Sequence, residues 1–381
     1  MSIKDQPFTV GIEEEYLLVD RETRDLATEP PAGLMKDCKK RLRERVAPEF
    51  LKAQIEVGTG VCKTLADARR DLCELRRTVV EVADGYGLAP IAAGTHPFAS
   101  WEEQKLTDKE RYNVLAHDLQ GVGRRLLICG LHVHVGIDDD DLRIDLMSQV
   151  TYFLPHMLAL STSSPFWKGE ETGLMSYRLT VFDGLPRTGL PDAFDSYAEY
   201  QRLVAAMVEG GLIEDATKLW WDVRVSARFP TLEMRLTDVC TRLDDAIAIA
   251  ALYLCTLSML TRLRRRNQRW RVYPRSLVNE NRWLAQRFGT DEGMVDFGVG
   301  RRVPFGNLLE ELLEYLREDA ERLDCVAEIE HAREILKHGT SAHRQIRTYH
   351  EAMAGGAGKE EALRAVVDML IETTREGIDG A

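Results

Sequence analysis

Apolar and polar side chains alternate along the first strand that the sequence predicts, between Phe8 and Val19. Successive side chains of a strand point to opposite faces, so Glu13 and Glu15 share one face while Glu14 lies on the other. Two carboxylates therefore project side by side. This stretch alone fits either a solvated sheet face or a site that attracts cations.

Three further predicted strands place polar groups at alternate positions. They are 50–57 with Glu56, 126–137 with His132 and His134, and 231–238 with Glu233 and Arg235. One such strand is ordinary, and the histidine pair alone fits two satisfied, half-buried imidazoles. Four strands of this kind predict a shared polar face on one sheet.

The helical signals gather in the last third of the chain. Thr64 and Asp67 form a capping box that predicts a helix start, and further helices are expected at 34–46, at 107–119 and up to about Leu160. From Leu243 onward the pattern is almost wholly helical. This distribution favours an α+β fold, in one catalytic domain over 1–381. Its parts are a mainly sheet-forming part at 8–240 and an integral helical part at 241–381.

Composition excludes several classes of protein. The chain has 381 residues, is 44% hydrophobic and carries a formal net charge of −12, which argues against nucleic acid or an anionic membrane as partner. The seven cysteines form no Cys-x-x-Cys pair, which favours reduced thiols in the cytoplasm. No signal peptide is expected, and the apolar run 246–260 is shorter than the about 20 residues that span a bilayer.

The candidate chemistry is that of a hard metal ion. Carboxylates with few imidazoles suit Mg²⁺ or Mn²⁺ better than structural zinc. Acidic residues with an arginine nearby also suit phosphoryl transfer, in which cations offset phosphate charge. The sequence has no GxxxxGK[ST] loop, so a nucleotide would be held by the metals and the sheet.

Several motifs together resemble those of the bacterial carboxylate–amine ligases called glutamate–cysteine ligase type 2. The motifs are Gly11-Ile12-Glu13-Glu14-Glu15, Gly94-Thr95-His96-Pro97, Gly130-Leu131-His132-Val133-His134-Val135-Gly136, Trp221-Asp222-Val223-Arg224, Thr231-Leu232-Glu233-Met234-Arg235 and Asn281-Arg282-Trp283-Leu284-Ala285-Gln286-Arg287-Phe288-Gly289. The resemblance implies a glutamine-synthetase-like fold, in which a curved antiparallel sheet forms a funnel flanked by helices. It also implies ATP and Mg²⁺, phosphorylation of the glutamate side chain, attack by an amine such as cysteine, and a homodimer.

The resemblance also assigns candidate roles to individual residues. The metal candidates are Glu13, Glu15, Glu56, His132 and Glu233. The catalytic candidates are Arg235, Glu233 and His134, with His134 or an acidic neighbour as the base. Cofactor binding is assigned to Arg235, Arg282 and Arg287, and substrate binding to Arg178, Arg187 and Arg224.

Two other functions remain open from the sequence. A binuclear metal hydrolase also uses a His-x-His strand, although usually in a parallel barrel of alternating strands and helices. A non-catalytic metabolite-binding protein of the same fold is the second alternative. The retained acidic residues argue against it, because a site without metal gains nothing from carboxylates that repel each other.

Overall fold

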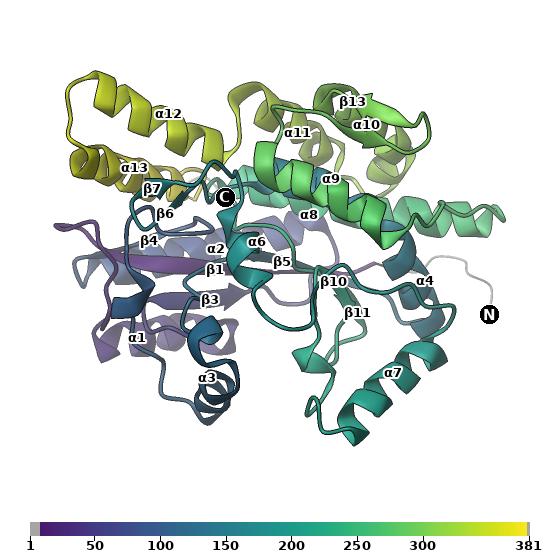
Figure 1. Ribbon diagram of the computed structural model, residues 1–381, viewed down its shortest axis with the longest axis horizontal. Coiled ribbons are helices and arrows are strands. Elements are labelled where there is room, and N and C mark those ends of the chain that lie inside the picture. The colour runs from purple at the N-terminus through teal and green to yellow at the C-terminus, as the bar shows by residue number, and fades with distance from the viewer. Residues whose placement is uncertain (1–7, 379–381) are drawn as a thin grey trace.

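A seven-stranded sheet forms the centre of the computed structural model, which describes residues 8–378 (Figure 1). The path runs β10-β11-β5-β1-β3-β2, β4 pairs with the end of β1, and every pairing is antiparallel. The strands are β1 (Val10–Asp20), β2 (Val46–Pro48), β3 (Gln54–Gly58), β4 (Leu88–Ile91), β5 (Leu131–Gly136), β10 (Val223–Val225) and β11 (Thr231–Met234). The α+β prediction with an antiparallel sheet is confirmed.

Three two-stranded pairs lie outside this sheet. They are β6 (Phe166–Trp167) with β7 (Glu170–Glu171), β8 (Thr188–Gly189) with β9 (Trp220–Trp221), and β12 (Met294–Asp296) with β13 (Arg301–Val303). The pair of β8 and β9 is parallel, and the other two are antiparallel.

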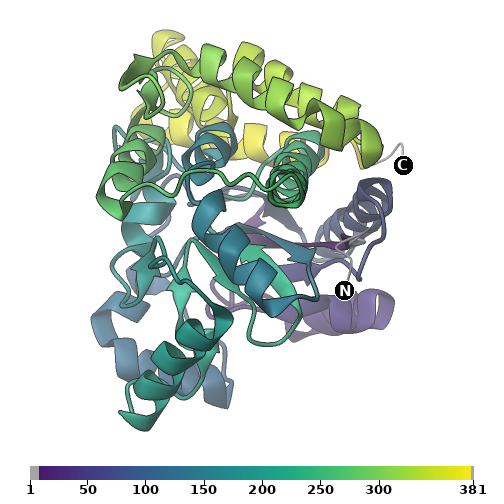
Figure 2. The same cartoon turned by 90° about the vertical axis from the view of Figure 1, so that its right-hand side faces the viewer.

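Helices cover the sheet, and the later ones gather on one side of it, as the green and yellow ribbons in Figures 1 and 2 show. The helices are α1 (Ala32–Leu42), α2 (Leu65–Asp84), α3 (Glu110–Gly123), α4 (Asp140–Val150), α5 (Leu154–Ser161), α6 (Tyr177–Phe182), α7 (Tyr197–Glu209), α8 (Leu243–Arg265), α9 (Arg275–Phe288), α10 (Phe305–Arg322), α11 (Val326–His338), α12 (Ser341–Ala354) and α13 (Lys359–Thr374). Helices α2 and α8 contact β1 and β5 respectively.

Local sequence explains where α2 begins and why α8 is buried. The Thr64 side chain accepts a hydrogen bond from the amide of Asp67, and the Asp67 side chain accepts one from the amide of Thr64, so the predicted capping box starts α2. Helix α8 is apolar on all sides because it lies inside the molecule. It is long and apolar enough to cross a membrane, but 89% of its most apolar window is buried in the fold.

The alternation along β1 places Glu14 on the face of the sheet opposite to Glu13 and Glu15. On the face away from the glutamates of the predicted site, Glu14 is fully buried and accepts hydrogen bonds from Arg76 of α2 at 2.5 and 2.7 Å and from the Tyr16 hydroxyl at 2.5 Å. Arg76 also donates to the carbonyls of Cys240 and Thr241. This cluster ties β1 to α2 and to the segment that leads into α8.

Several predicted boundaries were wrong. The helix expected at 34–46 ends at Leu42, and the strand expected at 50–57 begins at Gln54. The strand expected at 126–137 is regular only from Leu131. Strands end where their backbone loses a pairing partner, and the sequence pattern does not show that point.

The long helix expected up to Leu160 is two helices, because α4 ends at Val150 and α5 begins at Leu154. Pro155 occupies the first turn of α5, where a missing amide hydrogen costs nothing. The segment 163–191, which is rich in Gly and Pro, contains α6 and short strands. The helical last third is interrupted only by the β12–β13 hairpin within the described residues.

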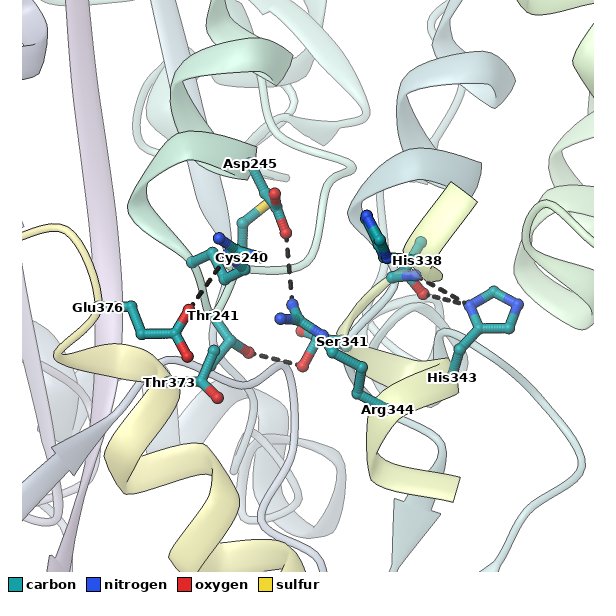
Figure 3. Close-up of polar contacts among 12 residues, drawn as sticks. Cys240, Thr241, Asp245, His338, Ser341, His343, Arg344, Thr373 and Glu376 are labelled. Atoms are coloured by element: carbon teal, nitrogen blue, oxygen red, sulfur yellow. Dashed lines mark hydrogen bonds and ion pairs between the residues drawn. The ribbon is translucent and has the colours of Figure 1, made fainter. Parts of the chain in front are cut away.

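Polar contacts join α12 to the beginning of α8 and to the segment just before it (Figure 3). The Thr241 and Ser341 hydroxyls lie 2.6 Å apart, and Arg344 of α12 lies 3.4 Å from Asp245 of α8. Both parts of the chain also contribute to one hydrophobic core. The single domain, with 241–381 as an integral part, stays a prediction.

Candidate active site

A cavity of about 410 Å³ lies over the polar face of the sheet. Its lining includes seven residues of the predicted site on β1, β3, β5, β10 and the β11 segment: Glu13, Glu15, Glu56, His132, His134, Arg224 and Glu233. Arg235 and Arg178 also line it. The structure therefore contains the shared polar face that the four strands predicted.

Strand register produces this assembly. His132 lies opposite Glu13, Glu56 lies opposite Glu15, and Glu233 lies opposite His134. Directly opposite residues of antiparallel strands point to the same face. The alternation on each strand therefore becomes one continuous surface of acids and imidazoles.

One group of metal-binding type consists of Glu13, His134 and Glu233, whose ligand atoms all lie within 4.8 Å of one another. His134 Nε2 is 3.5 Å from a Glu13 oxygen, and it is buried with no hydrogen-bond partner among the described residues. The other ring nitrogen, Nδ1, lies 3.0 Å from the Thr231 hydroxyl, which fixes the ring. An orphaned buried imidazole nitrogen between two carboxylates fits a metal ligand.

The second group consists of Glu15, Glu49 and Glu56, again with ligand atoms within 4.8 Å. Sequence reasoning missed Glu49, which lies between β2 and β3 and not on a strand. Its position seven residues before Glu56, directly after the strand that pairs with β3, is the signal that could have found it. Three carboxylates at this spacing form an oxygen-rich donor set of the type that Mg²⁺ and Mn²⁺ prefer.

Two carboxyl groups of the second group have raised pKa values. Burial, followed by the charge of Glu49, raises the pKa of Glu15 to about 7, against the pull of Arg178. Burial and the charges of Glu49 and Glu13 raise the pKa of Glu56 well above its ordinary value. Acids that resist ionisation at neutral pH are stabilised by a bound cation, so the electrostatics fit a metal as well as the donor atoms do.

The two carboxyl groups of the first group instead have lowered pKa values. Burial would raise the pKa of Glu13, but hydrogen bonds with His132 and His134 lower it well below its ordinary value. Burial also opposes ionisation of Glu233, but the charges of Arg235 and Arg224 lower its pKa. These two carboxylates are thus held as anions.

His132 lies outside both groups, with Nδ1 3.3 Å from an oxygen of Glu13. Burial and the charge of Arg235 lower the pKa of His132 to about 4, so its imidazole is neutral at physiological pH. A neutral imidazole is the form that binds metal. Its role as a metal ligand remains a prediction.

Two arginines hold Glu233 from either side. Arg224 Nε donates to one carboxylate oxygen at 2.9 Å, and Arg235 pairs with the other. Arg178 lies 2% exposed in α6 and donates to the carbonyls of Arg235 and Leu236, each at 3.2 Å. Positive charge therefore lies directly beside the acids, where phosphate oxygens would need it.

Two glycine motifs of the sequence serve this packing. A Cβ atom at Gly130 would collide with the Arg178 guanidinium in its present position beside the start of β5. A Cβ atom at Gly94 would be 2.9 Å from the carboxylate of Asp238, which is buried and accepts a hydrogen bond from Ser164 at 2.7 Å. Both glycines are required for close approach.

The remaining predicted arginines lie outside the cavity lining. Arg282 pairs with buried Asp222 and with Asp183, each at 2.7 Å. Arg287 lies over the ring of Phe288. Arg187 stacks on Trp220, which does line the cavity, and it donates to the carbonyl of Lys218. The structure therefore does not bring Arg282 or Arg287 to the cavity, and it brings Arg187 to its rim.

Several other residues that line the cavity are apolar. Phe50, Ile128, Phe182 and Leu185 line it, and the last three form a small hydrophobic cluster of their own. Phe229, 56% exposed at the turn before β11, lies edge-on to His134 with ring centroids 6.4 Å apart. The cavity thus combines a charged floor with apolar walls, an arrangement suited to a small polar substrate.

Solved structures share this fold. A glutamate–cysteine ligase from Francisella tularensis in complex with AMP aligns over 98% of this chain and 90% of its own, with 13% identity and a TM-score of 0.67. A bifunctional glutathione synthetase from Pasteurella multocida aligns over 97% of this chain with 15% identity and a TM-score of 0.68, and this chain spans 53% of it. At such identities the likeness concerns the fold.

Relatives in sequence are much closer. A protein of Rhodospirillum rubrum, provisionally named glutamate–cysteine ligase 2, is 62% identical over 98% of this chain and 97% of its own. A protein of Jannaschia sp. with the same provisional name is 56% identical over 97% of this chain and 98% of its own. The model of glutamate–cysteine ligase family 2 matches residues 9–367. The chain therefore belongs to glutamate–cysteine ligase family 2.

Proposed function

We propose that this protein is an ATP-dependent ligase that joins a carboxylate to an amine. The side-chain carboxylate of glutamate would be phosphorylated by ATP, and an amine would displace phosphate from the acyl phosphate to give an amide. Cysteine is the candidate amine, and γ-glutamylcysteine, ADP and phosphate would be the products. Family membership and the AMP complex of the Francisella enzyme support this proposal.

The observation that carries the proposal is the presence of two groups of metal-binding type beside three arginines on one sheet face. Glu13, His134 and Glu233 would hold one divalent cation, and Glu15, Glu49 and Glu56 another. Bound Mg²⁺, or Mn²⁺, would supply neutralising charge for the phosphate oxygens. A carboxylate and ATP are both anions, so this neutralisation addresses the main barrier to their reaction.

The arginines have separate tasks in this proposal. Arg235, which pairs with Glu233 and lines the cavity, would offset the charge of the transferred phosphoryl group. Arg224 and Arg178 would attract the substrate carboxylates, because both line the same cavity. Arg187 would contribute only from the rim. A role for Arg282 or Arg287 in cofactor binding would require each side chain to leave its present contacts.

The second step needs a group that accepts a proton from the attacking amine. His134 has a free Nε2 for this purpose, but the same atom belongs to the first metal group. If it binds metal, an acidic neighbour takes the proton. We assign His134 and Glu233 to the catalytic centre on this basis, with the base being one of its ionisable groups.

Two further proposals concern the whole molecule. We infer a cytoplasmic location from the cysteines, which form no Cys-x-x-Cys pair, and a homodimer from the family resemblance. Light scattering coupled to size-exclusion chromatography tests the dimer, and a mass of one chain would contradict it.

The decisive experiment measures phosphate release from ATP with Mg²⁺ and glutamate across a panel of amines that includes cysteine. Release that requires both glutamate and one amine, with a matching amide in the mass spectrum, is the expected result. Release with another carboxylate would keep the reaction and change the substrate. Folded, metal-loaded protein that releases no phosphate with any pair would contradict the ligase and favour a binding protein.

A further inference from the structure

A second cavity of about 360 Å³ lies in the helical part of the molecule. It is bounded by α5, by the segment 269–273 that leads to α9, by the β12–β13 hairpin and by α10, in the upper part of Figure 1. None of its lining residues lines the candidate active site. This cavity is therefore separate from the candidate active site.

Aromatic side chains dominate the wall of this cavity. The ring of Tyr152 lies 5.4 Å from that of Trp270 and 5.5 Å from that of Tyr273, measured between centroids. Trp270 in turn lies 5.5 Å from Tyr315, nearly perpendicular to it at 76°. Three of these rings are half-buried and Tyr315 is 42% exposed, so the group opens to solvent on one side.

Two carboxylates of the lining have no cationic partner. Asp296 accepts hydrogen bonds from the amides of Gly298 and Val299, and Glu311 accepts one from the Tyr315 hydroxyl at 2.7 Å. Neither forms an ion pair within the part of the chain that the structure describes. Their negative charge therefore remains uncompensated beside the rings.

The cations nearby are already engaged or lie at the edge. Arg269 pairs with Asp145 at 2.9 Å. Arg271 is exposed, lies 5.1 Å above the ring of Tyr273 and forms no ion pair among the described residues. Burial raises the pKa of Tyr152, and the charge of Asp296 raises it further.

We propose that this cavity binds a small ligand through an organic ammonium group, presented by a free amine or by an amino acid. Aromatic faces attract cations through their quadrupoles, and the unpaired carboxylates Asp296 and Glu311 supply the opposite charge. A neutral apolar ligand would leave both carboxylates unused. For an amino acid, Arg271 offers a partner for the ligand carboxylate at the edge of the cavity.

Three probes test this proposal by titration calorimetry. Phenethylamine carries the ammonium, 2-phenylethanol is its neutral counterpart, and phenylalanine adds a carboxylate. The test variant is the double substitution Asp296→Asn and Glu311→Gln, which removes both charges and keeps an oxygen to accept each existing hydrogen bond. Glu314→Gln, on the same helix but outside this lining, is the matched control.

We expect phenethylamine to bind the wild type in the millimolar range, the double variant to bind it at least about tenfold more weakly, and Glu314→Gln to bind it normally. Binding that survives Glu233→Gln, a change in the candidate active site, assigns the signal to this cavity. Tighter binding of phenylalanine that depends on Arg271 would identify an amino acid as the ligand, and its absence a free amine. Equal binding of 2-phenylethanol, or no binding of either ammonium probe to folded protein, would overturn the proposal.

Discussion

Glu15 and Glu56 lie directly opposite each other across β1 and β3, and both carboxyl groups line the same cavity. Like charges in opposite positions of a sheet destabilise it. The protein therefore maintains an arrangement that is unfavourable for folding alone and favourable for holding a cation.

This relationship predicts the effect of Glu56→Gln. Without metal, the substitution should stabilise the protein by about 1 kcal/mol, because it removes an acid whose ionisation is opposed by burial and by the charges of Glu49, Glu13 and Glu15. With Mg²⁺ present, the variant should lose the stabilisation that the ion gives the wild type. Thermal unfolding in EDTA and in Mg²⁺ measures both effects. A variant less stable than the wild type in EDTA would show that the Glu56 carboxylate is not unfavourable at this position.

Glu49→Gln tests the residue that the sequence did not reveal. Loss of one of three clustered carboxylates should weaken Mg²⁺ binding by at least about tenfold and reduce ligase activity accordingly. Metal titration of activity measures the change. Glu44→Gln, an exposed acid five residues earlier, should behave as the wild type. An unchanged metal requirement in Glu49→Gln would remove that residue from the site.

Arg235→Ala should lower the ligase rate by at least about 10²-fold, the scale expected when one charge-stabilising donor is removed. Glu233 would keep Arg224 as a partner, so the fold should persist. Circular dichroism checks the fold and phosphate release the rate. The exposed Arg202→Ala in α7 is the control. Near-normal turnover in Arg235→Ala would exclude the proposed role.

Arg282→Met should destabilise the protein by about 3–5 kcal/mol, because Asp222 would remain buried as an uncompensated charge. Adding Asp222→Asn should restore part of the loss. Urea unfolding measures both variants. If the folded single variant instead binds ATP poorly at unchanged stability, the predicted cofactor role of Arg282 would be favoured over the structural one.

The lowered pKa of His96 predicts that the protein loses stability as the pH falls. Its Nδ1 accepts the amides of Phe98 and Ala99, at 3.2 and 2.9 Å, and burial lowers its pKa from 6.5 to about 4. Between those values the unfolded chain binds a proton that the folded protein does not, so stability falls as pH decreases through this window. The slope is about 1.4 kcal/mol per pH unit for one proton.

The matched variant is His96→Asn, whose side-chain oxygen can accept the same amides but does not titrate. Its stability, measured by urea unfolding between pH 7 and pH 4, should fall with a slope smaller by one proton. An identical slope in both proteins would show that His96 is not the group responsible.

The sequence by itself determined the polarity of each strand and the family. Alternation placed Glu13 and Glu15 together, and the capping box of Thr64 and Asp67 started a helix at the right residue. These features depend on period and on local hydrogen bonds, which neighbouring residues decide. The pattern therefore predicted which polar residues share one face of the sheet, and their roles as metal ligands or catalytic groups stay predictions.

Only the tertiary structure decided what lies next to what. Glu49 joins the site from outside any strand, and Arg282 turns to Asp222 and away from the cavity. The contacts of both residues are long-range: a strand pairing sets the position of Glu49, and a buried carboxylate 60 residues away holds Arg282. Such choices follow from register and from the cost of unpaired buried charge, which no local pattern records.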